Sequence, residues 1–166
     1  MTRRSMVPGP PPRLAAMALV ACLSAACGAT RGGTGAESGT SRIEHFNEGV
    51  SLPAGLPFSE AVRVDSTLYM SGQIGIRPGT LELVPGGLEA EARQTMENIR
   101  ATLEAYGYSM RDVVKCLVMI EDISRWADFN AVYVEYFEAP YPARSALGTD
   151  GLALGAAVEV ECIAVK

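Results

Sequence analysis

Residues 42–166 of the sequence predict one domain that combines β-strands with two helices. Two kinds of pattern support this prediction. Short β-prone runs occur near the start, in the middle and at the end of the region, and apolar residues recur at helical spacing between them. About 125 residues are enough to bury one hydrophobic core. We therefore expect a single domain without internal repeats.

The first expected element is a hairpin. The runs 61–65 and 67–72 are rich in β-prone residues, and the short polar segment between them suits a tight turn. Residues 73–87 contain two Pro-Gly pairs and predict a loop or a short ribbon with two turns.

Two helices are expected next. After Glu89, apolar residues recur at steps of four and three and form one helix face, which Gly107 ends. Ser124 can cap the second helix, whose aromatic stripe is typical of a core contact. The two faces consist of Ala92, Met96, Ile99, Leu103 and Tyr106 in the first helix and Trp126, Phe129, Tyr133 and Phe137 in the second.

Two longer strands complete the prediction. Residues 113–120 suit a central strand with both faces partly covered. In the last run, 158–165, successive side chains point to opposite faces of the predicted strand. We expect the helices to cover its smooth apolar face. The other face carries two carboxylates among aliphatic side chains, which suits a subunit interface. The apolar face holds Val158, Val160, Cys162 and Ala164, and the other holds Glu159, Glu161, Ile163 and Val165.

The first 27 residues have the pattern of an export signal. Arginines precede an apolar run at 14–26, which is too short for a permanent membrane helix of about 20 residues. Residues 24–28 are similar to a bacterial lipobox, which predicts lipidation of Cys27. Cys22 is a second candidate, and ordinary signal cleavage near Ala26 is the alternative. We expect an exported protein, either periplasmic or anchored to a bacterial membrane as a lipoprotein.

Composition restricts the partners of the chain. Residues 28–41 are rich in Gly, Ser and Thr and nearly free of apolar residues, so we expect a flexible linker. From residue 42 onward there are ten Lys and Arg against eighteen Asp and Glu. Such an acidic domain disfavours nucleic-acid binding, which normally requires a basic patch.

Cysteine and histidine usage gives no sign of a metal or a cofactor. Cys116 and Cys162 do not belong to a CxxC pair, so buried free thiols are the simplest expectation. An exported protein could instead pair them if their Cα atoms lie within about 7 Å. His45 has no neighbouring metal ligands and is expected at the surface.

Arg144 is the strongest candidate for a functional residue. Pro142 biases Tyr141 toward an extended conformation, so Arg144 is expected on a strand. Taken alone, an arginine at such a place could form a structural ion pair, which is a common role.

Three motifs, in order, identify a family resemblance. Ser71-Gly72-Gln73-Ile74, Pro142-Ala143-Arg144-Ser145 and Val158-Glu159-Val160-Glu161 resemble those of the RidA family, also called YjgF, over roughly Phe46 to Lys166. The resemblance implies a chorismate-mutase-like α+β fold with a mixed sheet and two helices on one face. It also implies a homotrimer with ligand clefts between subunits. The implied activity is cofactor-free hydrolysis of reactive 2-imino or enamino acids, such as 2-aminoacrylate and 2-iminopropionate, to 2-keto acid and ammonia.

The resemblance also implies roles for individual residues. Arg144 matches the arginine that binds the substrate carboxylate, which a guanidinium fits bidentately. Glu159 matches the acid that orients or activates a water molecule. Ser71 and Asn130 match residues that border the cleft, although Ser71 could simply bond the local backbone.

Two positions depart from the best-known deaminases of the family. Phe58 stands in place of a tyrosine, and Ala146 stands in place of a cysteine. The pocket therefore lacks a hydroxyl and a thiol, and we expect substrate orientation or range to differ.

Other classes of function remain open. The same trimeric clefts could bind small carboxylates or aromatic ligands without turnover. Export favours this alternative, because reactive imines arise mainly in the cytoplasm. A ribonuclease role, reported within the family, fits poorly with an acidic domain outside the cytoplasm.

Overall fold

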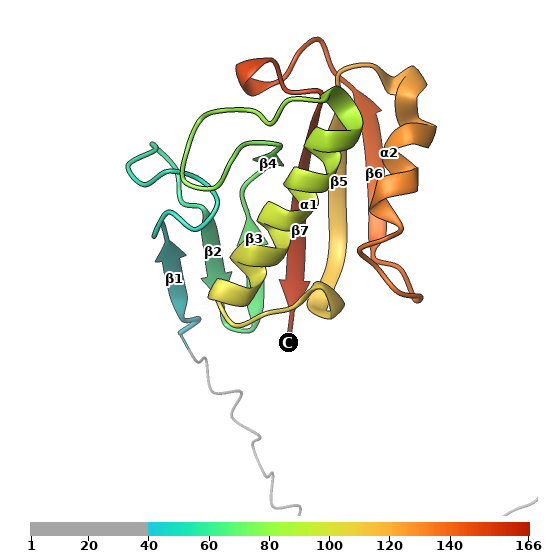
Figure 1. Cartoon of the computed structure of the whole chain (residues 1–166). Helices are drawn as coiled ribbons and strands as arrows, with labels where there is room; N and C mark the ends of the chain where they lie inside the picture. The colour runs from blue at the N-terminus through green and yellow to red at the C-terminus, as the bar shows by residue number, and fades with distance from the viewer. Residues whose placement is uncertain (1–39) are drawn as a thin grey trace, which may run out of the picture. The chain divides into compact units, whose positions relative to one another are not determined.

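The computed structural model describes residues 40–166 (Figure 1). The predicted signal peptide, the lipidation of Cys27 and nearly all of the predicted linker fall outside these residues. The described residues belong to one unit. Within this unit, no helix combines the length and the hydrophobicity that a membrane span requires.

The core of the unit is a seven-stranded sheet (Figure 1). Its strands run in the order β1-β2-β3-β7-β5-β6, and β4 pairs separately with β7. Only β5 and β6 are parallel, so the sheet is mixed, as predicted. The strands are β1 Ile43–Phe46, β2 Ala61–Val64, β3 Thr67–Met70, β4 Gln73–Ile74, β5 Val113–Ile120, β6 Ala143–Gly148 and β7 Val158–Val165.

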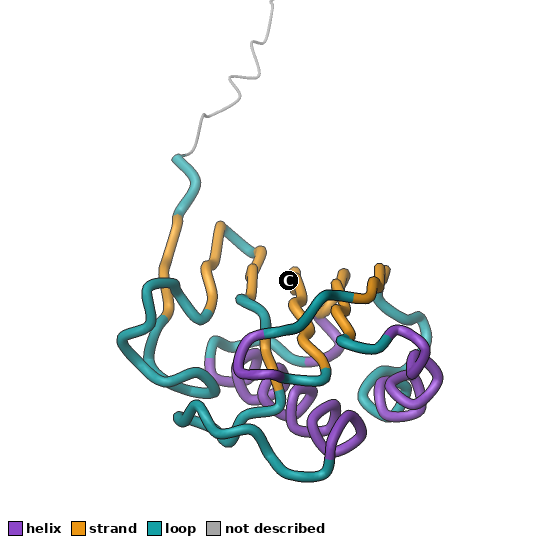
Figure 2. The backbone as a smooth tube through the Cα atoms, turned by 90° about the horizontal axis from the view of Figure 1, so that it is seen from above, coloured by secondary structure: helices purple, strands orange, loops and turns teal. Residues whose placement is uncertain are grey.

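Both helices pack on one face of this sheet (Figures 1 and 2). Helix α1 spans Gly87–Ala105 and buries the apolar face that its spacing predicts. Gly107 follows the C-cap residue Tyr106 with a φ of 84°, a conformation in which glycine avoids the steric cost of a side chain. On β7, Val158, Val160, Cys162 and Ala164 lie beneath the helices. The opposite face of the sheet carries no helix (Figure 2).

Helix α2 differs from its predicted bounds. It spans Trp126–Tyr133, so Phe137 lies beyond its end, although Phe137 is buried against Tyr133. Ser124 is not the N-cap. Its backbone N–H and its hydroxyl both donate to the Asp122 carboxylate, which begins a 3-10 turn before α2. An ionised carboxylate is a stronger acceptor than a serine hydroxyl, which explains why Asp122 takes this position.

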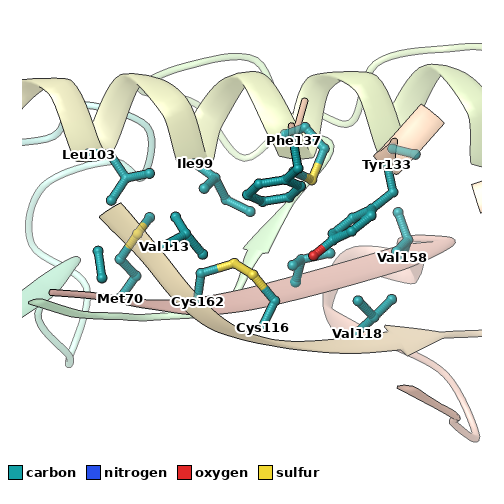
Figure 3. Close-up of a cluster of buried hydrophobic side chains, with 14 of the residues drawn as sticks. Met70, Ile99, Leu103, Val113, Cys116, Val118, Tyr133, Phe137, Val158 and Cys162 are labelled. Carbon is teal, nitrogen blue, oxygen red and sulfur yellow. A yellow bond between two sulfur atoms is a disulfide. The ribbon is translucent and has the colours of Figure 1, made fainter. Parts of the chain in front are cut away.

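The two cysteines of the domain are paired. Register places Cys116 on β5 opposite Cys162 on β7, with Cα atoms 4.2 Å apart, and a disulfide joins them in the core (Figure 3). The expectation of free thiols is therefore wrong, because this register was not evident from the sequence. Disulfides are typical of exported proteins. Export itself stays a prediction, since its signal lies outside the described residues.

A buried carboxylate fixes the loop before β2. Glu60 is fully buried and accepts hydrogen bonds from the backbone N–H groups of Ser51, at 2.7 Å, and Leu52, at 3.0 Å. The Tyr106 hydroxyl of α1 donates to the same carboxylate at 2.9 Å. Burial, together with this bond, raises the pKa of Tyr106. The Glu60 backbone in turn accepts from the Ser71 N–H, which ties this loop to the end of β3.

Candidate functional site

Arg144 lies on β6, the edge strand next to β5. Its register partner is Cys116, so its side chain leaves the sheet on the helix face. The guanidinium carbon lies 4.5 Å from the ring centroid of Trp126 and 4.3 Å from that of Tyr133. Both contacts have the geometry of cation–π interactions. The aromatic side chains therefore hold the cation in one orientation.

The Arg144 guanidinium has no anionic partner among residues 40–166. No carboxylate in this region lies within 4 Å of it. Its Nη1 atom is buried and forms no hydrogen bond within the described chain. A structural ion pair is therefore excluded among residues 40–166. The Arg144 side chain is partly exposed and lines an open hollow, so the held cation can bind an external carboxylate.

Two of the other predicted residues lie with Arg144. Ala146 is on the same face of β6 and lines an open hollow together with Arg144 and Trp126. Asn130 lies four residues after Trp126 and three before Tyr133, so it shares their face of α2. Its Oδ1 atom is buried without a hydrogen-bond partner in the described chain. Arg144 and Asn130 thus each bring a polar atom without a partner in the described chain to the region between α2 and β6.

Glu159 lies elsewhere, on the face of the sheet that carries no helix. Its neighbours Val158 and Val160 are buried beneath the helices, so its side chain points the other way. The carboxylate lies against the backbone of Gly72, where an added Cβ would be 1.9 Å from Oε1. Burial raises the pKa of Glu159, and the like charge of Glu161 raises it further. A carboxyl group of raised pKa is a better proton acceptor when it is ionised.

Ser71 and Phe58 accompany Glu159. The Ser71 hydroxyl donates to the backbone oxygen of Ser59 at 2.7 Å, as the alternative local reading predicted. The role of Ser71 toward a ligand stays a prediction. Phe58 precedes Ser59 in the same loop and is 48% exposed, so its ring is available to a ligand or to another subunit.

Arg144 and Glu159 therefore do not meet within one subunit. They project from opposite faces of the sheet, and β5 separates their strands. A site that uses both residues therefore needs a second subunit, in line with the clefts between subunits that the family resemblance implies. One half-site contains Arg144, Asn130 and Ala146. The other contains Glu159 and Ser71, and Phe58 precedes the backbone group of Ser59 that Ser71 contacts.

Comparison with known proteins identifies the family. Residues 49–166 match the family described as Endoribonuclease L-PSP. The chain belongs to this family, also called RidA or YjgF. A 2-iminobutanoate/2-iminopropanoate deaminase of Capra hircus is 44% identical over 128 residues, which cover 76% of this chain and 93% of the relative. A RutC family protein of Pyrococcus horikoshii is 42% identical over 121 residues, which cover 73% of this chain and 95% of the relative.

Solved structures of the RidA family share the fold. RidA from an Antarctic Psychrobacter species has a TM-score of 0.70 and 41% identity, with coverage of 74% of this chain and 99% of that one. The YjgF gene product of E. coli has a TM-score of 0.69 and 32% identity, with coverage of 74% and 98%. The predicted α+β class with two helices on one face of a mixed sheet is confirmed.

Sequence reasoning missed three residues that shape this RidA-family site. Trp126 and Tyr133 were interpreted as core, although both also contact the Arg144 guanidinium. Asn130, a polar residue within the aromatic stripe, was a signal that this helix face is not purely core. The third residue is Gly72, and a glycine at a strand end is a signal of close approach.

The raised pKa of Glu159 predicts the pH dependence of a reaction that needs this carboxylate ionised. On the acid side, kcat/KM should fall at a pH above the usual titration range of a glutamate, because burial and Glu161 both disfavour the charge of Glu159. Replacing Glu161 by Gln removes the like charge, lowers the pKa of Glu159 and shifts this fall to lower pH. The measurement is kcat/KM against pH for both proteins. Glu138→Gln is the control, and a fall in kcat/KM that Glu161→Gln leaves at the same pH would contradict the assignment.

Proposed function

We propose that this protein hydrolyses reactive 2-imino acids, or their enamine tautomers, to 2-keto acids and ammonia. The observation that carries the proposal is the stacked guanidinium of Arg144, whose buried Nη1 has no partner in the described chain. Relatives named 2-iminobutanoate/2-iminopropanoate deaminases, about 44% identical to this chain, support the same reaction.

The proposed mechanism uses the two half-sites together. Arg144 binds the substrate carboxylate and thereby fixes the imine carbon. Glu159 accepts a proton from a water molecule as the water oxygen bonds to that carbon. Glu159 passes this proton to the imine nitrogen, which gives a carbinolamine. Glu159 then takes the proton of the carbinolamine hydroxyl and returns it to the nitrogen, so that the carbon–nitrogen bond breaks, ammonia leaves and the carbonyl forms. One water is consumed for each ammonia released. Asn130 Oδ1 is suited to accept a hydrogen bond from the imine or amine nitrogen.

A shared site requires a second subunit, and we propose a homotrimer. The face of the sheet without helices carries Glu159 among Leu117, Met119 and Ile163, a mixture that favours burial against another chain. Arg144 lies on the edge strand, where it is accessible to a neighbour. Light scattering of the full chain should give the mass of three chains. A measured mass equal to that of a single chain would refute the trimer and, with it, the site shared between subunits.

The experiment that tests the function generates 2-iminopropionate in situ with an amino-acid oxidase and follows 2-keto acid release. We expect the wild-type protein to exceed the uncatalysed rate. Arg144→Ala should lose about 100- to 1,000-fold in kcat/KM, since a desolvated carboxylate–guanidinium contact contributes about 2–5 kcal/mol. Arg111→Ala, at an exposed arginine, is the matched control. A wild-type rate equal to the uncatalysed rate would refute the proposal.

Binding without turnover is the second candidate. The specific observation in its favour is that the half-site of Arg144 is present in one subunit, whereas Glu159 is not part of it. A chain that does not assemble could therefore bind a carboxylate but lacks the general base. Calorimetry with pyruvate, compared with the turnover assay, separates the two candidates. Binding that Arg144→Ala abolishes, without any turnover, would favour the binding module.

A further inference from the structure

The side chains that line the hollow beside Arg144 are apolar except for the guanidinium. The volume of the hollow is about 510 Å³, and its lining consists of Ile123, Trp126, Arg144 and Ala146. Arg144 is the one charged side chain of this lining. The other three present a branched aliphatic chain, an indole ring and a methyl group. A ligand held by its carboxylate at Arg144 therefore places its remaining substituent among apolar atoms.

Side-chain size along β6 gives the hollow its shape. Arg144, Ala146 and Gly148 alternate onto the same face of this strand. Ala146 fills little space. At Gly148 an added Cβ would lie 3.0 Å from the Cβ of Ile123, so the Ile123 side chain packs where a side chain of β6 would otherwise stand. The result is a trough that leads from the guanidinium across Ala146 toward Ile123.

Trp126 has two roles in this arrangement. Its ring stacks on the guanidinium at 4.5 Å, which orients the cation, and it also lines the trough. Ile123 is 46% exposed and lines the same hollow, so its aliphatic surface is accessible there. Both residues therefore offer apolar surface at the place where the substrate side chain would lie.

We infer that Trp126, Ile123 and Ala146 select 2-imino acids with a bulky apolar side chain, such as those derived from leucine or phenylalanine. This inference rests on the proposed hydrolysis of imino acids. A leucine-type side chain would extend over Ala146 and contact Trp126 and Ile123, whereas the methyl group of 2-iminopropionate leaves the trough unfilled. Each methylene in an apolar pocket changes selectivity about 10-fold or more. A charged side chain would lose hydration without gaining a partner there.

The test compares imines generated from alanine, leucine, phenylalanine and glutamate by amino-acid oxidases that accept each of them, at matched rates of imine formation. The imine carbon is trigonal, so the chirality of the amino acid does not matter. With the full-length protein, kcat/KM for the leucine-derived imine should exceed that for the alanine-derived imine by at least about 10-fold. The value of kcat/KM for the glutamate-derived imine should not exceed that for the alanine-derived imine, although the glutamate side chain is larger.

A variant assigns the preference to the trough. Ala146→Leu fills the space above β6 and should reduce the leucine-to-alanine ratio of kcat/KM by at least about 10-fold. The ratio does not depend on the fraction of folded protein, so a purely structural defect leaves it unchanged. Val134→Ala, an exposed aliphatic residue at the end of α2 outside the lining, is the matched control and should keep the wild-type ratio.

The outcomes distinguish a failure of this inference from a failure of the proposed function on which it rests. Hydrolysis of none of the imines above the uncatalysed rate refutes the deaminase proposal itself. Hydrolysis of all of them with equal efficiency, or with a preference for the alanine-derived imine, leaves the deaminase standing and overturns the inference. A leucine preference that survives Ala146→Leu also overturns it, because the selective pocket would then lie elsewhere.

Discussion

Mixed oligomers of Arg144→Ala and Glu159→Gln chains should recover about one quarter of wild-type activity, although each variant alone is nearly inactive. In a cyclic trimer with shared sites, any mixed trimer has one site with both an intact Arg144 and an intact Glu159. Random mixing makes about three quarters of the trimers mixed, each with about one intact site in three. Each single variant should lose about 100-fold or more, since Arg144 binds the carboxylate and Glu159 supplies general base catalysis.

The physical reason for this result is the position of the two side chains in one subunit. They leave opposite faces of the sheet, so no conformational change of a side chain can bring them to one ligand. The measurement is imine hydrolysis after the two variants are unfolded and refolded together. The same variants mixed without subunit exchange are the control. No recovery in mixed trimers of confirmed composition would place both residues of each site on a single chain.

Replacement of Glu60 by Ala should lower the free energy of unfolding by about 3–5 kcal/mol, a large effect for a residue outside the site. Its buried carboxylate accepts from the backbone N–H groups of Ser51 and Leu52 and from the Tyr106 hydroxyl. Removing it leaves these donors unsatisfied in a region without access to water, and each such group costs about 1–3 kcal/mol. Denaturant unfolding, followed by circular dichroism, measures the change.

Two further variants make the test of Glu60 specific. Glu60→Gln keeps the shape of the side chain but presents an N–H₂ group to donors. Its free energy of unfolding should therefore fall by less than that of the alanine variant and by more than that of a surface variant. Glu138→Ala removes an exposed carboxylate that lies 3.5 Å from Arg111 and should leave the unfolding midpoint almost unchanged. Equal effects of Glu60→Ala and Glu138→Ala would mean that the buried network does not stabilise the fold.

Local patterns were sufficient for most of the architecture. The spacing of Ala92, Met96, Ile99 and Leu103 predicted the buried face of α1, and alternation predicted which face of β7 the helices cover. The hairpin of β2 and β3 and the strand β5 also agree with their predicted ranges. Strand β1 was missed, because its four residues mix polar and apolar side chains and gain their hydrogen bonds from β2.

By itself the sequence determined the family and the α+β class and predicted the two residues most central to the proposed chemistry, because periodicity and short motifs are local properties of a chain. Only the tertiary structure decided how those residues are arranged. Strand order and register place Cys116 against Cys162, stack Arg144 between Trp126 and Tyr133, and turn Glu159 to the opposite face. These relations join residues distant in sequence, and pairing between strands, rather than local preference, sets them.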